Sequence, residues 1–351
     1  MNRYQIVEVT EQFNHAGTKA TADIAVIAEQ LGFQRINICM NNTEAGNIAK
    51  VKRQIGYYCD WSRCFTSIEP KSIVLLQHPF HHKQLTRKKI LTKLKKEKNA
   101  KFISLVHDVE ELRAFRYNDY YKNEFETMMD LADVLIVHNQ KMKNWFIDQG
   151  VDEGKLVDLQ IFDYLQNELN NKTAVFERSI TIAGNLDTTK CGYIGKLGNL
   201  NGVGINLYGP NFDEKLSGYS NINYHGSFPV DEIPNKLTKG FGLVWDGNSL
   251  NGCQGKSGQY LKYNNPHKLS LYLSSGLPVV IWCGAAEADF VRKYNVGLCV
   301  NTLMELQEIF RDLTEDEYGK MSDNVAELKT KLINGEFGRR SIEEACKRVE
   351  F

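Results

Sequence analysis

The sequence predicts an α/β protein with two doubly wound, Rossmann-like domains that face a cleft, followed by a helical carboxyl-terminal tail. The chain has 351 residues, which exceeds the roughly 250 to 300 residues at which a single core usually stops growing. Short apolar runs alternate with longer amphipathic ones, and the runs 72–76 and 134–137 are apolar almost throughout. Such strands are typical of a parallel sheet that helices cover on both faces.

This alternation occurs twice along the chain. The first half predicts strands and helices at 6–9, 18–32, 36–39, 45–59, 72–76, 81–101, 101–106 and 134–137. After the polar stretch 166–179, the second half predicts them at 179–184, 205–210, 221–226, 230–238, 240–246, 266–275, 278–284 and 296–300, and the rest is helical. We therefore assign domains to 1–165 and 166–330, and expect the helix in 331–351 to pack back on the first domain.

Composition excludes several classes of protein. Apolar residues make up 42% and charged residues 25%, and 43 basic residues balance 43 acidic ones, so no net field favours nucleic acid. The eight cysteines form no Cys-x-x-Cys pair, which argues against a zinc ribbon or a disulfide framework. The first residues do not resemble a signal peptide and no apolar run approaches about 20 residues, so we expect a cytoplasmic protein, at most bound to the inner face of a membrane.

Ligands of doubly wound sheets bind beyond the carboxyl ends of the strands. Gly184 and Asn185 follow the predicted strand 179–183, where a glycine lets a ligand approach the backbone, and Lys190 could reach a phosphate. An ordinary turn with a solvated lysine is the alternative. Tyr208 also ends a strand, and either offers a face for a base or belongs to the core. No dinucleotide or P-loop glycine pattern is present.

A lysine opens the apolar helix that precedes Gly-Leu-Pro. Pro266 suits the first turn, so His267 and Lys268 lie at the positive end of the helix, where a lysine is unfavourable without an anion. A phosphate bound to the free amides would remove this conflict, although a lysine that leans into water is the simpler alternative. Glu287, after a turn of small residues, either caps a helix or accepts a sugar hydroxyl.

The order of these motifs resembles bacterial glycosyltransferases of the GT-B architecture. The local match is KLSLYLSSGLPVVIWCGAAEADFVRKYNVGLCV, and residues 14–33, QHP, HDVEELR, IFDYL and AGNLDTTK are similar to β-galactofuranosyltransferases and to the related glucosyltransferases that extend streptococcal adhesins. The resemblance covers about residues 4–345. It implies that the second domain binds a UDP-sugar and the first binds a glycan or glycolipid acceptor. The UDP contacts that it implies by position are Thr18, Lys190, Tyr208, His267 and Lys268. Where the adhesin-directed enzymes place an arginine after Gly-Asn, this chain offers Lys190.

Transfer of a sugar requires stabilisation of the leaving diphosphate and a base for the acceptor hydroxyl. No Asp-x-Asp ends a predicted strand, so we expect neither a metal nor another cofactor. His107 and Asp108 follow the strand 101–106 and are the catalytic candidates, with Asp108 preferred, although it could simply cap the next helix. Gly17 and Thr18 could meet the diphosphate across the cleft.

The segment 81–101 carries nine Lys or Arg residues and one acid, Glu97, with leucines at helical spacing. It is either a solvated outer face or a peripheral contact with an anionic membrane. The leading function is transfer of a hexose, galactofuranose first, to a growing cell-surface glycan, lipid-linked in our interpretation. Alternatives are a glucosyltransferase acting on N-acetylglucosamine-modified glycoprotein, a non-catalytic UDP-binding partner and an epimerase. The oligomeric state, homo-oligomers included, stays open.

Overall fold

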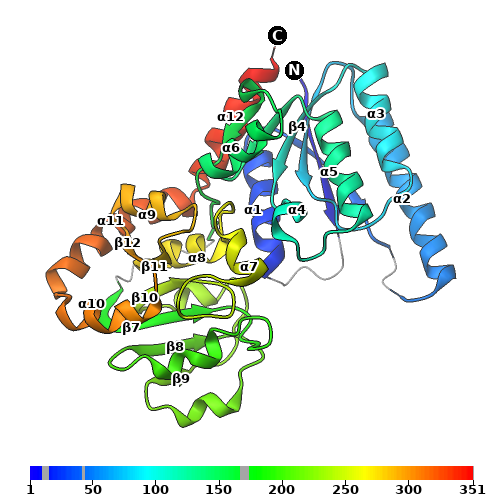
Figure 1. Ribbon diagram of the computed structural model, residues 1–351. Coiled ribbons are helices and arrows are strands. Elements are labelled where there is room, and N and C mark those ends of the chain that lie inside the picture. Colours follow the sequence, from blue (N-terminus) through cyan, green and yellow to red (C-terminus); the bar gives the residue numbers. More distant parts are fainter. Residues whose placement is uncertain (10–15, 42–43, 167–173, 351) are drawn as a thin grey trace.

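The computed structural model describes residues 1–9, 16–41, 44–166 and 174–350. Two six-stranded parallel sheets follow one another along the chain, and a helical region ends it (Figure 1). The predicted fold class is confirmed. The domain boundary that we placed between 165 and 166 stays a prediction.

The first sheet has the strand order β2-β1-β3-β4-β5-β6. Its elements are β1 (Arg3–Val9), α1 (Ala16–Gln30), β2 (Gln34–Cys39), α2 (Asn47–Ser67), β3 (Ile73–His78), α3 (Arg87–Glu97), β4 (Lys101–Val106), α4 (Glu110–Arg113), α5 (Asp119–Leu131), β5 (Val134–Val137), α6 (Gln140–Asp148) and β6 (Leu156–Asp158).

The second sheet has the strand order β12-β11-β10-β7-β8-β9. Its elements are β7 (Val175–Ala183), β8 (Gly204–Tyr208), β9 (Ile222–Tyr224), β10 (Lys239–Val244), α7 (Gly255–Tyr260), α8 (His267–Ser275), β11 (Val279–Trp282), α9 (Ala288–Tyr294) and β12 (Gly297–Val300). The tail consists of α10 (Leu306–Asp312), α11 (Glu315–Ile333) and α12 (Glu336–Val349).

Uninterrupted apolar strands arise because each face of the first sheet is buried. In β3, Ile73 and Leu75 pack with residues of α1 and α12, whereas Val74 and Leu76 pack with residues of α2 and α3. Successive side chains of a strand point to opposite faces, so both sets must be apolar. The sheet is therefore a rigid support whose carboxyl ends can hold functional side chains.

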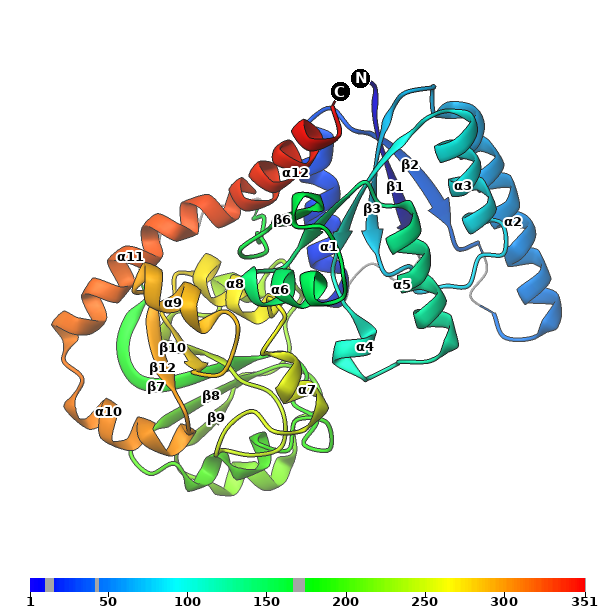
Figure 2. The same cartoon turned by 45° about the horizontal axis from the view of Figure 1, so that its top comes forward.

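The last helix returns to the first domain. Figure 2 shows α12 running beside α1, with both termini of the chain close together. Ile342, Ala345 and Val349 of α12 join the core of the first sheet. The Asp163 carboxylate accepts hydrogen bonds from the backbone N–H groups of Phe337 (3.2 Å) and Gly338 (2.6 Å), which fixes the start of this helix.

Two local predictions need correction, and the structure distinguishes between the alternatives for a third segment. The helix expected at 230–238 is only a 3₁₀ turn, Ile233–Asn235, with Pro234 in its first positions. Strand β7 begins at Val175, inside the stretch that we predicted to be a separator, because Val175 still pairs with Lys239 of β10. In the basic segment 81–101, Leu91 and Leu94 are buried against the first sheet. The apolar side of α3 therefore faces the core, which agrees with the outer-face interpretation.

Candidate active site

Both sheets reverse their strand order at one point, and ligands of such sheets bind where this reversal occurs. In the first sheet β1 lies between β2 and β3, so the reversal is at the carboxyl ends of β1 and β3. In the second sheet β7 lies between β8 and β10, so the reversal is at the carboxyl ends of β7 and β10. The residues that follow these four strands therefore define two candidate half-sites.

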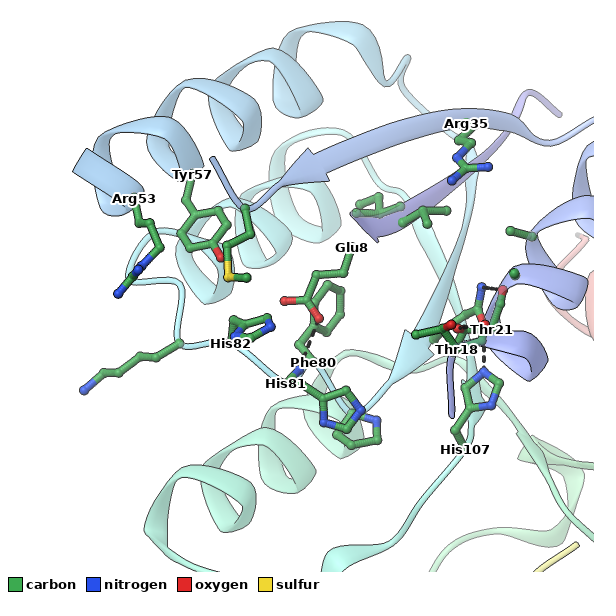
Figure 3. A pocket seen from close by; sticks show the side chains of 18 of the residues that line it. Glu8, Thr18, Thr21, Arg35, Arg53, Tyr57, Phe80, His81, His82 and His107 are labelled. Carbon is green, nitrogen blue, oxygen red and sulfur yellow. Dashed lines mark hydrogen bonds between the residues drawn. The ribbon is translucent and has the colours of Figure 1, made fainter. Parts of the chain in front are cut away.

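The first half-site is a cavity of about 1170 Å³ at the carboxyl ends of β1 and β3. Figure 3 shows Thr18, Thr21 and His107 at one end of it and Arg53 and Tyr57 at the other. Glu8, at the end of β1, lies between them. Burial raises the pKa of Glu8 to about 7, against the opposing hydrogen bond from the His81 backbone and the charge of Arg87.

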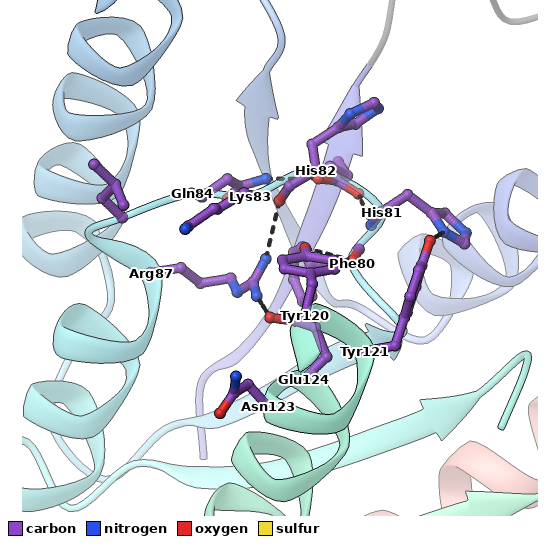
Figure 4. Close-up of polar contacts among 12 residues, drawn as sticks. Phe80, His81, His82, Lys83, Gln84, Arg87, Tyr120, Tyr121, Asn123 and Glu124 are labelled. Carbon is purple, nitrogen blue, oxygen red and sulfur yellow. Dashed lines mark hydrogen bonds and ion pairs between the residues drawn. The ribbon is translucent and has the colours of Figure 1, made fainter. Parts of the chain in front are cut away.

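The loop 79–84, which forms one wall of this cavity, is held in place from behind. Arg87 forms an ion pair with Glu124, and its guanidinium lies 4.4 Å from the centre of the Phe80 ring (Figure 4). The Tyr120 hydroxyl donates to the Phe80 carbonyl at 2.7 Å. From the cavity side, Glu8 accepts hydrogen bonds from His81 N (3.1 Å) and Gln84 Nε2 (2.6 Å). The wall is therefore preorganised.

His107 lines the cavity at the end of β4. Its Nε2 lies 2.6 Å from Gln77 Oε1, and its ring stacks on Phe162 with centroids 5.2 Å apart. Burial, together with the positive charge of neighbouring histidines, lowers the pKa of His107 well below its ordinary value. The imidazole is therefore neutral at pH 7. When Nε2 donates to Gln77, Nδ1 keeps a lone pair that can accept a proton.

Asp108 faces a different neighbourhood. Arg113 Nη1 donates to its carboxylate at 2.7 Å, and Tyr260 of the second domain forms a further hydrogen bond with it. Burial raises the pKa of Asp108 to about 6, whereas Arg113 opposes the shift. The Tyr260 hydroxyl also accepts from Val109 N at 3.1 Å. Asp108 thus takes part in a contact between the domains, and it is absent from the described lining of the cavity.

The second half-site is built from two glycine turns and one ammonium. Gly184 and Gly209 follow β7 and β8 with φ of +145° and +142°, conformations that favour glycine. A methyl group on Gly209 would lie 1.8 Å from the Gly184 carbonyl oxygen, so the two turns are in backbone contact. A methyl group on Gly184 would lie 3.6 Å from Lys268 Cε. Lys268 therefore runs along the Gly184 turn.

Lys268 lies in the first turn of α8, where Leu269 N donates to the Pro266 carbonyl at 2.9 Å, while the backbone N–H groups of His267 and Lys268 have no backbone acceptor among the described residues. Burial lowers its pKa, but the charge of Asp246, with smaller contributions from Tyr272 and two cysteines, outweighs burial and raises the pKa above its ordinary value. Within the described residues, no carboxylate forms an ion pair with Lys268. A charged, half-buried ammonium beside free helix amides suits an anionic ligand.

Phe162 connects the two half-sites. Its ring stacks on His107 of the first domain and meets His267 of the second edge-on, with centroids 6.2 Å apart. The Tyr164 ring also stacks on His267, with centroids 5.1 Å apart. Lys19 Nζ lies 4.8 Å from the centre of the Tyr164 ring. Burial, with the charge of Lys19, lowers the pKa of His267 to about 4. Its Nε2 is buried and has no hydrogen-bond partner among the described residues.

The structure brings together only some of the residues predicted from the sequence. Gly184, His267 and Lys268 gather around the start of α8. Gly17 and Thr18 lie in the first turn of α1, and Thr18 lines the cavity of the first domain.

The other predicted donor residues lie in different surroundings. Lys190 is exposed and pairs with Asp187 at 3.6 Å, and Asn185 accepts from Asn211 at 2.9 Å. Tyr208 is 7% exposed and stacks on His225, which agrees with the core alternative. Glu287 is buried beside Asn139 at the contact between the domains, and burial raises its pKa well above the ordinary value.

Sequence reasoning assigned no role to Asp246, Phe162 or Tyr260. Asp246 comes shortly after β10, so its position at a strand end was the available signal. Phe162 belongs to the motif IFDYL, which we used only for the resemblance. Tyr260 carries no pattern that distinguishes it from a core tyrosine. Within the described ranges, no group of three or more His, Cys, Asp or Glu side chains is placed to hold a metal ion.

Comparison with known proteins places the chain in a family. Models of the amino-terminal and carboxyl-terminal domains of glucosyltransferase 3-like proteins match residues 3–161 and 180–345. Beta-1,6-galactofuranosyltransferase WbbI of Escherichia coli is 31% identical over 338 residues, which cover 94% of each chain. Glucosyltransferase 3 of Streptococcus gordonii is 23% identical over 348 residues, which cover 98% of this chain and 99% of the relative.

Solved structures agree on the fold. The lipopolysaccharide outer core galactosyltransferase WaaB, in its apo form, has a TM-score of 0.60 at 12% identity and covers 98% of this chain and 99% of its own. The Anabaena protein HepE, in complex with UDP, has a TM-score of 0.57 at 12% identity with the same coverage. The chain is thus a glycosyltransferase of the GT-B type, and it belongs to the glucosyltransferase 3-like family that the sequence resembles.

Proposed function

We propose that the protein transfers a hexose, galactofuranose first, from a UDP-sugar to a hydroxyl group of a growing cell-surface glycan. The observation that carries the proposal is the position of Lys268. This residue belongs to the first turn of α8, and its half-buried side chain lies along the loop at Gly184. The relative at 31% identity is a galactofuranosyltransferase, which supports this sugar. A structural neighbour that holds UDP supports the nucleotide.

In this proposal Lys268 and the free amides of α8 stabilise the diphosphate as negative charge develops on it. Such preorganised donors are worth most where water is excluded. His267, with an unpartnered Nε2 beside Lys268, offers the donor one further polar contact. This machinery requires no metal ion and no other cofactor, so activity should survive treatment with a chelator.

His107 is the base in this proposal. It lines the cavity of the first domain, where the acceptor would bind, and its lowered pKa keeps it neutral. The proton of the acceptor hydroxyl would pass to Nδ1 while the hydroxyl oxygen forms the new bond to the anomeric carbon. The anomeric carbon–oxygen bond breaks, and UDP leaves with the electron pair. Asp108, which we preferred on sequence grounds, is engaged by Arg113 and Tyr260 instead.

The test is a donor screen followed by substitution. Purified protein is assayed with UDP-galactofuranose, UDP-galactopyranose and UDP-glucose, and Lys268→Ala should lower kcat by about 10²- to 10³-fold, as expected for loss of one such donor. Lys190→Ala is the matched control, because an exposed pair contributes little, about fivefold at most.

Full activity of Lys268→Ala would remove this lysine from the mechanism. Turnover of UDP-glucose alone would identify a glucosyltransferase. Binding of UDP without transfer to any acceptor would identify a non-catalytic partner.

A further inference from the structure

Helix α2 is apolar on two opposite sides. On one side Tyr57, Trp61 and Cys64 are buried in the core of the first domain. On the other side four large apolar side chains face outward: Ile48 (76% exposed), Val51 (59%), Ile55 (59%) and Tyr58 (59%). Their spacing of three, four and three residues aligns them along one stripe of the helix. Among the described residues, no other helix carries more than one exposed large apolar side chain.

The stripe continues onto the loop before α3. Leu85, which is 69% exposed, donates its backbone N–H to Gln54 Oε1 at 3.0 Å. Gln54 Nε2 in turn donates to the Lys83 carbonyl at 2.8 Å. Because Gln54 lies between Val51 and Tyr58 on the helix surface, these bonds hold Leu85 beside the stripe. We call Ile48, Val51, Ile55, Tyr58 and Leu85 together the α2 apolar surface. Figure 1 shows α2 on the outer side of the first domain.

Positive charges flank this surface. Lys52 on α2, Lys83 in the loop and Lys88 and Lys89 on α3 are all exposed. The acids nearby are few or already engaged: Asp60, the one acid within α2, is buried and paired with Arg63, and Glu97 pairs with Lys93 at the far end of α3. Glu44, before the helix, and Glu69, after it, are exposed acids as well, and the Glu44 carbonyl accepts from Arg53.

Apolar side chains in a stripe with lysines beside them are the pattern of a surface that rests on anionic lipid. A large exposed apolar patch marks an interaction site, and the flanking lysines favour an anionic membrane as its occupant. The segment 81–101, to which we assigned the membrane contact from the sequence, contributes mainly charge, because Leu91 and Leu94 are buried. We propose that the α2 apolar surface is a peripheral docking site for an anionic membrane.

The docking site also determines how an acceptor would reach the protein. This step rests on the proposed function, in which the acceptor binds in the cavity of the first domain. Lys50, Arg53 and Tyr57, on the opposite side of α2, line the cavity where the acceptor would bind. Only the thickness of one helix, about 10 Å, therefore separates the cavity from the lipid surface. An acceptor whose sugar extends from a membrane-anchored carrier could reach this cavity without leaving the bilayer.

The experiment measures flotation of the full chain with vesicles of phosphatidylglycerol and phosphatidylcholine, and with phosphatidylcholine alone. The protein should float with the anionic vesicles only, and less so as salt is raised. Val51→Ser/Ile55→Ser should weaken binding by on the order of tenfold or more. Val175→Ser is the matched control, because Val175 is a 65% exposed apolar residue on the second domain.

A charge-reversal pair tests the second part of the site. Lys52→Glu/Lys88→Glu should lose binding to anionic vesicles, whereas Lys331→Glu, an exposed lysine on α11, should not. Neither double variant touches the cavity or Lys268, so hexose transfer to a water-soluble acceptor should be unchanged. This readout separates a failed docking site from a failed catalytic proposal.

Two outcomes would overturn the docking site. One is equal vesicle binding by the wild type and Val51→Ser/Ile55→Ser. The other is self-association, seen by sedimentation velocity and abolished by the same substitutions, in a protein that does not bind vesicles. The second result would mean that another copy of the chain covers the surface.

Discussion

The two half-sites are built in different ways from the same type of sheet. At the carboxyl ends of β1 and β3, side chains from several elements surround an open cavity of about 1170 Å³. At the carboxyl ends of β7 and β8, two glycine turns touch through their backbones and a single lysine lies along them. Substitution of side chains around the first half-site can alter which ligand binds there without altering the backbone. The second depends on backbone shape, which suits a ligand part that is constant, such as a diphosphate.

The largest effect should come from the side chain that we assign as base. His107→Ala should lower kcat by about 10²- to 10³-fold, the usual contribution of a positioned base, while UDP binding is retained. Loss of UDP binding in equal measure would instead make His107 a structural residue. Single-turnover rates and UDP titration by calorimetry separate the two outcomes.

The pH profile tests the same assignment. A base must be neutral, so the rate should fall as pH is lowered through the depressed pKa of His107, and the acid limb should lie well below pH 6.5. Asp108 has a pKa of about 6, so an acid limb near pH 6 that Asp108→Asn abolishes would identify the aspartate as the base.

The second effect concerns the backbone of the donor half-site. Gly209→Ala places a methyl group 1.8 Å from the Gly184 carbonyl oxygen and also strains φ. The turns must separate, so UDP affinity should fall by about tenfold or more, since backbone strain of this kind costs on the order of 1 to 3 kcal/mol. Isothermal titration with UDP measures the change.

Gly32→Ala is the control for this experiment. Gly32 also has a positive φ, of +81°, but a methyl group there would meet nothing within 4 Å, and the residue lies in the first domain. The Gly32→Ala variant should be less stable because of the strained φ, but it should keep its UDP affinity. Equal losses of UDP affinity in the two variants would contradict the importance of the contact between the glycine turns.

Much of the fold and one half-site could be predicted from the sequence for the same physical reason. Strands buried on both faces must be apolar, so 72–76 and 134–137 identify a covered parallel sheet, and such sheets bind ligands at their carboxyl ends. This reasoning brought Gly184 and Lys268 into one hypothesis. It could not orient side chains, so Tyr208, which points into the core, and Lys190, which points into solvent, were indistinguishable from ligand contacts.

Two of the residues that sequence reasoning missed, Phe162 and Tyr260, act across the domain boundary. Phe162 contacts His107 and His267, which are 160 positions apart in the chain, and no periodic pattern records such a contact. The exposed stripe of α2 was missed for a related reason. A helix that is apolar on two sides gives the same pattern as a helix buried on both, and only the packing distinguishes them.

The smallest expected effect concerns the link between the half-sites. Tyr260 belongs to the second domain, yet its hydroxyl accepts from Val109 N and bonds to Asp108 of the first. Tyr260→Phe leaves a buried N–H without its acceptor, which costs about 1 to 3 kcal/mol. Because that free energy holds the domains together rather than the reacting atoms, we expect kcat to fall by only about three- to tenfold.

Tyr263→Phe controls for the loss of a hydroxyl on the same segment, because the Tyr263 hydroxyl has no hydrogen bond among the described residues. The distinguishing readout is the pKa of Asp108, followed by carboxyl NMR. The hydrogen bond from Tyr260 lowers this pKa, so Tyr260→Phe should raise it above about 6, and Tyr263→Phe should leave it in place. A fall in kcat without that rise would mean that Tyr260 acts only through packing, and that the two half-sites are coupled through Phe162 rather than through Asp108.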